Sequence, residues 1–233
     1  MSRGQSHVVG VVVLLALGVV TLSLVTAGVG ALVDSSAENA DATRVADTFE
    51  KGLRPATAGG AGALSVAVTD GRLHTENRTL RLTRDGAVVE SANVSALVYD
   101  GGGYGATALD GAVVVRTGGG ARVRRGFPVT ATPELLVVGV ARLRGDVDVA
   151  ANRPTTVRLR TETTHERRDL DGGTYRLSVE TATPGAFERY YRERGVAVEP
   201  RIDPDGDGVE SVVLAFPRAT RVALVTHETE LVR

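Results

Sequence analysis

Hydrophobic residues are distributed in two different ways along this chain of 233 residues. Near the N-terminus they form one continuous run, residues 8–33, in which the only polar side chains are Thr21, Ser23 and Thr26. As a helix rising 1.5 Å per residue, these 26 residues would measure about 39 Å, which exceeds the ~30 Å hydrocarbon core of a bilayer. We therefore expect residues 5–33 to form a transmembrane helix.

The next segment has a helical pattern of a different kind. Apolar residues recur at intervals of three and four between polar ones, at Ala42, Val45, Ala46, Phe49 and Leu53. Gly52 and Pro55 predict the end of this helix. The pattern predicts an amphipathic stalk helix over residues 34–54, and the Gly/Ala-rich stretch that follows predicts a hinge over residues 55–63.

From residue 64 onward, short segments of alternating apolar and polar residues are separated by turn residues. Asp70-Gly71 and Asp85-Gly86 lie between two such segments, which is typical of β-hairpins. In a later segment Val157 and Leu159 alternate with arginines, as expected for a strand with one face in water. Residues 64–233 are therefore predicted to form an extracellular, mainly antiparallel β domain, either a sandwich or an open barrel.

One short helix is expected within the β region. Pro184-Gly185 precede it, Gly195 follows it, and Phe187, Tyr190 and Tyr191 recur on one of its faces. These aromatic side chains either pack onto the sheet or form an exposed contact patch for a neighbouring subunit or a glycan. The predicted fold class is thus α+β: a long N-terminal transmembrane and stalk helix, followed by the β domain with one short helix.

Charge and composition narrow the function classes. The chain has 27 basic and 28 acidic residues, so no overall field favours nucleic acid, and no nucleic-acid partner is expected. Cysteine is absent, which excludes disulfides and thiolate metal sites. Arg3 is the only charged residue before the apolar run, whereas acidic residues predominate after it. The positive-inside rule then places the N-terminus in the cytoplasm and the C-terminal domain outside a cell membrane that the chain crosses once.

Two motifs carry candidate chemistry. Asp203, Asp205 and Asp207 are spaced like the opening of a calcium loop, although the twelfth position holds Leu214 in place of glutamate. Both a weak calcium site and an ordinary acidic turn fit this pattern, and no other cofactor is expected. Asn77 and Asn93 begin N-glycosylation acceptor sequences, which matter only in an exported chain. The four histidines are scattered and no nucleophile motif occurs, so an enzyme is not expected.

The N-terminus carries a family resemblance. Arg3-Gly4-Gln5-Ser6-His7, followed by a Val- and Gly-rich run, resembles the class III signal of archaeal type IV pilin-like proteins. The resemblance implies that a prepilin peptidase cleaves between Gly4 and Gln5, with Arg3 as the basic residue of the signal, and that residues 1–4 are a leader peptide. The remainder more loosely resembles haloarchaeal pilin-like envelope proteins, although these are usually more acidic.

The resemblance also implies a function. Family subunits bundle their N-terminal helices into a filament core, so we expect a structural or accessory subunit of a surface filament or adhesion apparatus. Its partners would be membrane lipid, prepilin peptidase and other pilin-like subunits. The alternative is a solitary membrane-anchored ectodomain that binds an envelope component or a solute.

Overall fold

The computed structural model describes residues 36–54 and 60–232. The chain divides into two compact units, residues 1–40 and 41–233. The described part of the first unit is the beginning of a helix that covers residues 36–52. The predicted leader, residues 1–4, and the predicted transmembrane helix, residues 5–33, lie outside the described residues.

The described chain is mainly β, which corrects the predicted α+β class. Strands make up 65% of the described residues. Helices are confined there to residues 36–52 and to α2, Pro184–Arg192. Neither helix combines the length and the apolar character that a membrane span requires. The α+β expectation was wrong because helical periodicity is limited to these two short segments, whereas the period of two extends through most of the chain after residue 60.

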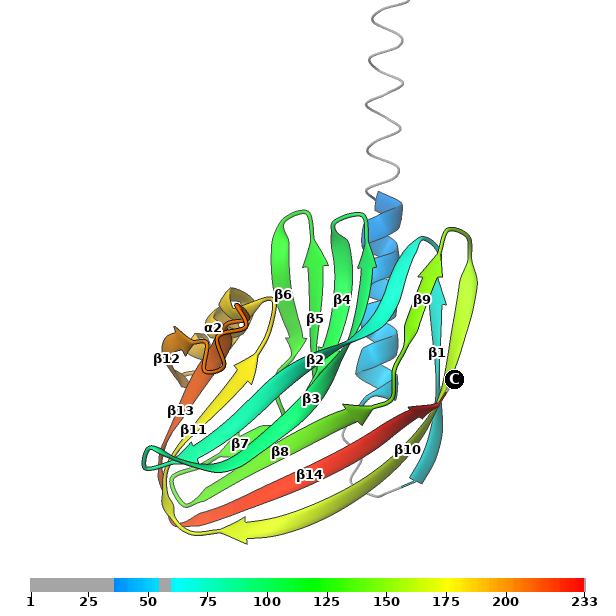
Figure 1. Cartoon of the computed structure of the whole chain (residues 1–233). Coiled ribbons are helices and arrows are strands. Elements are labelled where there is room, and N and C mark those ends of the chain that lie inside the picture. Colours follow the sequence, from blue (N-terminus) through cyan, green and yellow to red (C-terminus); the bar gives the residue numbers. More distant parts are fainter. Residues whose placement is uncertain (1–35, 55–59, 233) are drawn as a thin grey trace, which may run out of the picture. The chain divides into compact units, whose positions relative to one another are not determined.

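The first sheet has five strands and one parallel pair (Figure 1). Its order is β1 (Gly60–Val68), β10 (Thr155–Leu170), β14 (Arg221–Val232), β8 (Leu135–Arg144) and β7 (Val129–Ala131). All neighbours are antiparallel except β8 and β14, which run parallel from the pair Arg221–Leu135 to the pair Glu230–Arg144. A long crossover, residues 145–220, makes that parallel pairing feasible, since parallel strands cannot be joined by a tight turn.

The second sheet has nine strands, all paired antiparallel. Its order is β12 (Ala197–Ile202), β13 (Ser211–Ala219), β11 (Gly173–Glu180), β2 (Gly71–Arg84), β3 (Ala87–Gly101), β4 (Tyr104–Leu109), β5 (Ala112–Thr117) and β6 (Gly120–Arg125), with β9 (Asp148–Ala151) paired to β2. At the β2–β3 and β4–β5 turns, Asp85-Gly86 and Asp110-Gly111 have positive φ at both residues. This backbone geometry is that of the tight turns that match the twist of a hairpin.

The long β2–β3 hairpin carries apolar residues on opposite faces at its two ends. Near the turn, Leu82 and Ala92 join a cluster that contains residues of both sheets and of α2, which we call the inter-sheet cluster. Near the other end, Leu73 and Leu97 join a cluster with β1, β10 and the helix residues Ala42, Val45, Ala46 and Phe49, which we call the helix cluster. The β domain is therefore stabilised by two cores.

The beginning of the β domain differs from the expected hinge. Residues 55–59 lie outside the described residues, and strand β1 begins at Gly60. Residues 60–63 therefore belong to a strand, because their backbone pairs with residues 160–163 of β10 despite their glycine and alanine composition.

Candidate functional site

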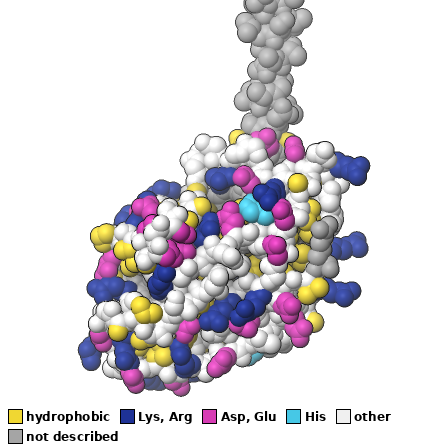
Figure 2. All heavy atoms as spheres, viewed as in Figure 1, with side chains coloured by type: hydrophobic (Ala, Val, Ile, Leu, Met, Phe, Trp, Pro, Cys, Tyr) yellow, Lys and Arg dark blue, Asp and Glu magenta, His cyan; other side chains and the backbone are white. Residues whose placement is uncertain are grey.

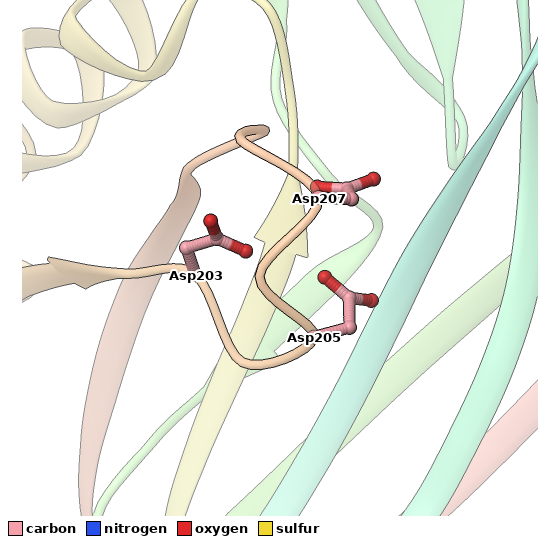
Figure 3. Close-up of side chains that lie close together, drawn as sticks. All are labelled: Asp203, Asp205 and Asp207. Atoms are coloured by element: carbon pink, nitrogen blue, oxygen red, sulfur yellow. The ribbon is translucent and has the colours of Figure 1, made fainter.

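The three predicted calcium ligands lie together on the loop between β12 and β13 (Figure 3). Asp203, Asp205 and Asp207 are exposed, and one carboxylate oxygen of each lies within 4.8 Å of the others. Gly206 and Gly208 have φ of +73° and +87°, a backbone conformation that glycine adopts without steric cost and that coils the loop.

The carboxylates of this loop already have partners within the chain. Asp203 accepts hydrogen bonds from the backbone N–H groups of Gly206 and Gly208 at 2.9 and 3.0 Å. Asp205 pairs with Arg81 at 3.1 Å, and the hydrogen bond from Arg81 lowers the pKa of Asp205. A hard cation could gather the three carboxylates, but it would compete with Arg81 for Asp205. Both interpretations of the motif, a weak calcium site and an acidic turn, fit this geometry.

The two glycosylation sequons face each other on adjacent strands. Asn77 of β2 and Asn93 of β3 are both exposed. In the antiparallel register Asn77 lies opposite Ser95, and Thr79 lies opposite Asn93, so each asparagine is paired with the hydroxyl residue of the other sequon. Glycans on the two asparagines would therefore emerge from one patch of the sheet, which the spacing of the sequons along the chain does not reveal.

Two of the three aromatic residues predicted on α2 belong to the core. Phe187 is fully buried and Tyr191 nearly so. The ring of Phe187 stacks on Phe127 with a centroid distance of 4.5 Å, and the Tyr191 hydroxyl oxygen accepts a hydrogen bond from the Phe127 N–H at 2.7 Å. Burial raises the pKa of Tyr191. Only Tyr190 is partly accessible, with the guanidinium of Arg194 over its ring at 3.5 Å, so the exposed contact patch reduces to this one residue.

Two adjacent arginines, Arg124 and Arg125, bind the helix of residues 36–52 to the β domain. The sequence alone did not indicate this role. Arg124 pairs with Asp47 at 2.5 Å and with Glu50 at 3.1 Å. Arg125 donates hydrogen bonds to the backbone oxygens of Glu50 and Leu53, at 2.5 and 2.9 Å, and to that of Gly111 at 2.6 Å. Its guanidinium thus satisfies carbonyls that the end of a helix leaves without partners. Burial lowers the pKa of Arg125, and the carboxylate of Glu50 opposes this effect.

A second unexpected feature is a pocket of about 120 Å³ on the face of β2, β3, β4 and β5. Its polar walls include His74, Glu76, Arg78 and Arg116. The Glu76 carboxylate bridges two of them, with His74 Nε2 at 3.0 Å and Arg78 on its other oxygen. Apolar side chains such as Leu109 and Val114 also line it. Convergent polar groups beside apolar side chains are typical of small-molecule sites, although this volume is below the ~300 Å³ at which such sites usually begin.

The predicted cleavage-site residues Arg3, Gly4 and Gln5 lie outside the described residues.

The chain belongs to the DUF7289 family, a family of unknown function, whose model matches residues 3–232. No curated protein and no solved structure matches it. Because the family match begins before the apolar run and ends at the last strand, the apolar segment and the β domain are parts of one family unit.

Proposed function

We propose that this chain is a membrane-anchored, pilin-like protein of the cell surface. The apolar segment of residues 8–33 holds it in membrane lipid in a single pass, with the N-terminus in the cytoplasm and the β domain outside. The observation that carries this proposal is an apolar run of 26 residues without an ionisable side chain, inside the same family unit as the β domain.

The attachment of the helix to the β domain supports a structural role. Only residues 34–40 separate the apolar run from Asp41, the first residue of the β-containing unit. From there Phe49 is fully buried in the helix cluster, and Arg125 binds the carbonyls at the helix end. A force applied through the anchor is then carried by the core of the domain, as a displayed filament or adhesion subunit requires.

The N-terminal sequence supports processing and assembly. Arg3-Gly4-Gln5-Ser6 has the order of residues that a prepilin peptidase recognises, according to the resemblance. Gly10, Gly18, Gly28 and Gly30 give the apolar segment small residues that permit close approach of neighbouring subunits. We propose that cleavage after Gly4 leaves the apolar segment on the mature subunit, which then joins other pilin-like subunits.

Mass spectrometry of the mature N-terminus in membranes of the native host tests this proposal. We expect the mature chain to begin at Gln5. Gly4→Leu should abolish cleavage while the protein stays in the membrane fraction, and Ser2→Leu serves as the control that leaves cleavage intact. A membrane-bound wild-type chain that retains Met1 or Ser2 would contradict prepilin processing, and a chain recovered from the cytosol would contradict the anchor.

The second candidate is a solitary anchored domain that binds a solute, and the pocket with His74, Glu76 and Arg78 favours it. Electron microscopy of purified surface appendages, with mass spectrometry for this chain, separates the two candidates. Recovery of the chain in filaments supports the subunit. Its recovery only in membranes, while filaments purified from the same cells lack it, supports the solitary domain.

A further inference from the structure

Five strands lie at the ends of the two sheets, and they differ in how their unpaired side is protected. The edge strands are β1 and β7 in the first sheet and β6, β9 and β12 in the second. An edge strand presents unpaired N–H and C=O groups to which another chain can add a strand. Natural proteins prevent this with short strands, proline, charge, bulges or a covering element.

Four of the five edges carry such protection. Strand β7 has three residues and β9 has four, each too short to offer a long ladder. Strand β12 contains Pro200 within an irregularity between Glu199 and Ile202. Strand β6 contacts α2, from which Arg189 donates a hydrogen bond to the Ala121 oxygen at 2.9 Å, and its last two arginines bind the helix of residues 36–52.

Strand β1 has none of these devices. Its nine residues contain no proline and no charge, and their register with β10 is unbroken from Gly60 to Val68. Residues 60–63 are all exposed. Within the described part of the chain, β10 is the only strand that pairs with β1, and no backbone hydrogen bond outside the sheet involves it.

The strand beside β1 indicates the charge of a partner. Arg160 lies opposite Ala63, and Arg158 lies opposite Ser65. Both arginines are exposed and make no ion pair within the described residues. In the view shared by Figures 1 and 2, basic side chains project from the margin of the β domain where β1 and β10 lie. A strand added to β1 would be about 10 Å from β10, two strand spacings away, and the small side chains of Ala63 and Ser65 let the arginines extend over β1.

We infer that the free edge of β1 binds an extended acidic segment of a partner protein, which adds a sixth strand to the first sheet. In an added antiparallel strand, the residues on the solvent side of the sheet lie beside Ser65, Ala63 and Ala61 of β1. Across β1, they are level with Arg158, Arg160 and Glu162 of β10. The complementary pattern is two acidic residues and one basic residue at alternate positions. Main-chain hydrogen bonds supply the pairing and the charges supply the register.

A second copy of this chain is a poorer occupant of the same edge. If two copies paired through β1, the added strand would present alanine and serine in place of acidic side chains. Arg158 and Arg160 of both copies would then stay without partners. A different, acidic chain is therefore the better occupant, whether or not the protein is anchored in a membrane.

The test uses the full chain in a mild detergent and a fluorescent peptide with glutamate, glutamate and lysine at alternate positions between valines. Binding is followed by fluorescence anisotropy and by hydrogen exchange of residues 60–65. We expect saturable binding, protection of these amides, and about tenfold weaker binding to the double variant Arg158→Glu, Arg160→Glu. The control pair Arg218→Glu, Arg221→Glu changes two exposed arginines on either side of the β13–β14 turn, at the opposite end of β14 from Arg160, and should leave binding unchanged.

Two further probes separate strand addition from simple charge attraction. The peptide is N-methylated on alternate residues in two patterns, one of which removes the N–H groups that face β1 while the other leaves them free. We expect only the second pattern to bind. Equal binding of both patterns, no binding of the unmethylated peptide, or protection of residues 60–65 through self-association of the protein would each overturn the proposal.

Discussion

The two helices of the described chain are attached to the β domain by different interactions. Helix α2 is held mainly by aromatic rings, with Phe187 stacked on Phe127 at 4.5 Å and Tyr191 beside them. The helix of residues 36–52 buries a single aromatic residue, Phe49, and its end is bound by the guanidinium of Arg125. Both attachments use residues far away in the chain, Phe127 for α2 and Arg125 for the helix of residues 36–52, but only the second relies on hydrogen bonds to the backbone at the helix end. The helix of residues 36–52 thus has a polar attachment in addition to its apolar one.

The largest expected effects are on the two apolar attachments. Phe49→Ala and Phe187→Ala each remove a ring that is 0% exposed, and each should lower the free energy of unfolding by about 3–5 kcal/mol. Urea unfolding of the full chain in a mild detergent, followed by circular dichroism, measures both losses. Lys51→Ala, at an exposed position of the same helix, is the control and should change stability by less than about 0.5 kcal/mol. A loss below about 1 kcal/mol for Phe49→Ala alone would mean that the helix is not part of the cooperative unit.

The next effect tests the polar attachment, that is, the hydrogen bonds from Arg125 to backbone oxygens at the end of the helix. Arg125→Met keeps much of the aliphatic packing but removes three hydrogen bonds to backbone oxygens, so we expect a loss of about 2 kcal/mol. Hydrogen exchange should show faster opening of residues 49–53 than of α2. Arg125→Lys should restore only part of the loss, because one ammonium group cannot reproduce the planar arrangement of donors. Equal acceleration of exchange in both helices would count against a local role for this arginine.

A third effect concerns the β4–β5 turn, Asp110-Gly111. Asp110 is 2% exposed, and its Oδ1 accepts a hydrogen bond from the Ala141 N–H of β8 at 2.6 Å, while Gly111 accepts one from Arg125. Burial raises the pKa of Asp110 well above its ordinary value, and the hydrogen bond from Ala141 opposes this effect. The folded chain therefore keeps a proton that the unfolded chain has lost, and stability falls as the pH rises from about 4 toward the pKa of the folded state.

Asp110→Asn isolates this contribution. Asparagine tolerates the positive φ of this position and keeps the acceptor for Ala141, but it does not titrate. We expect the difference in unfolding free energy between variant and wild type to grow in favour of the variant as the pH rises. His227 lines the same small cavity, and its pKa is lowered by burial, so the comparison must use this difference and not the wild-type curve alone. A difference that stays constant with pH would contradict a buried, proton-holding carboxyl.

The sequence pattern correctly predicted those features that neighbouring residues determine, such as strand alternation and tight turns. The alternation of Val157 and Leu159 with arginines correctly indicated a strand with one buried face, and Asp85-Gly86 lies at a hairpin turn. The parallel pairing of β8 with β14 could not be predicted, because the two strands meet only through the packing of everything between them. The predicted class gave too much weight to helical periodicity, which occurs in the described chain only near Phe49 and Phe187.

The same distinction applies to the candidate sites. The spacing of Asp203, Asp205 and Asp207 predicted a cluster of carboxylates, since a short loop brings them together, but not the ion pair with Arg81. Phe187 had both a core and a surface interpretation, because the face that α2 turns to the sheet is a property of tertiary packing. Pairings between distant strands are absent from any local pattern, and this applies also to the free edge of β1.

The smallest expected effect separates the two neighbouring arginines. Arg124 pairs with Asp47 and Glu50 at the surface, and all three side chains are more than a quarter exposed. Such pairs are weakened by solvent and salt, so Arg124→Met should cost about 0.5 kcal/mol, far less than Arg125→Met, and the cost should shrink in 0.5 M salt. Urea unfolding of the two variants at low and high salt distinguishes an exposed ion pair, made by Arg124, from a half-buried guanidinium that caps backbone oxygens, that of Arg125. If the two losses of stability were equal and equally sensitive to salt, surface charge alone would hold the helix. That result would contradict the polar attachment assigned to Arg125.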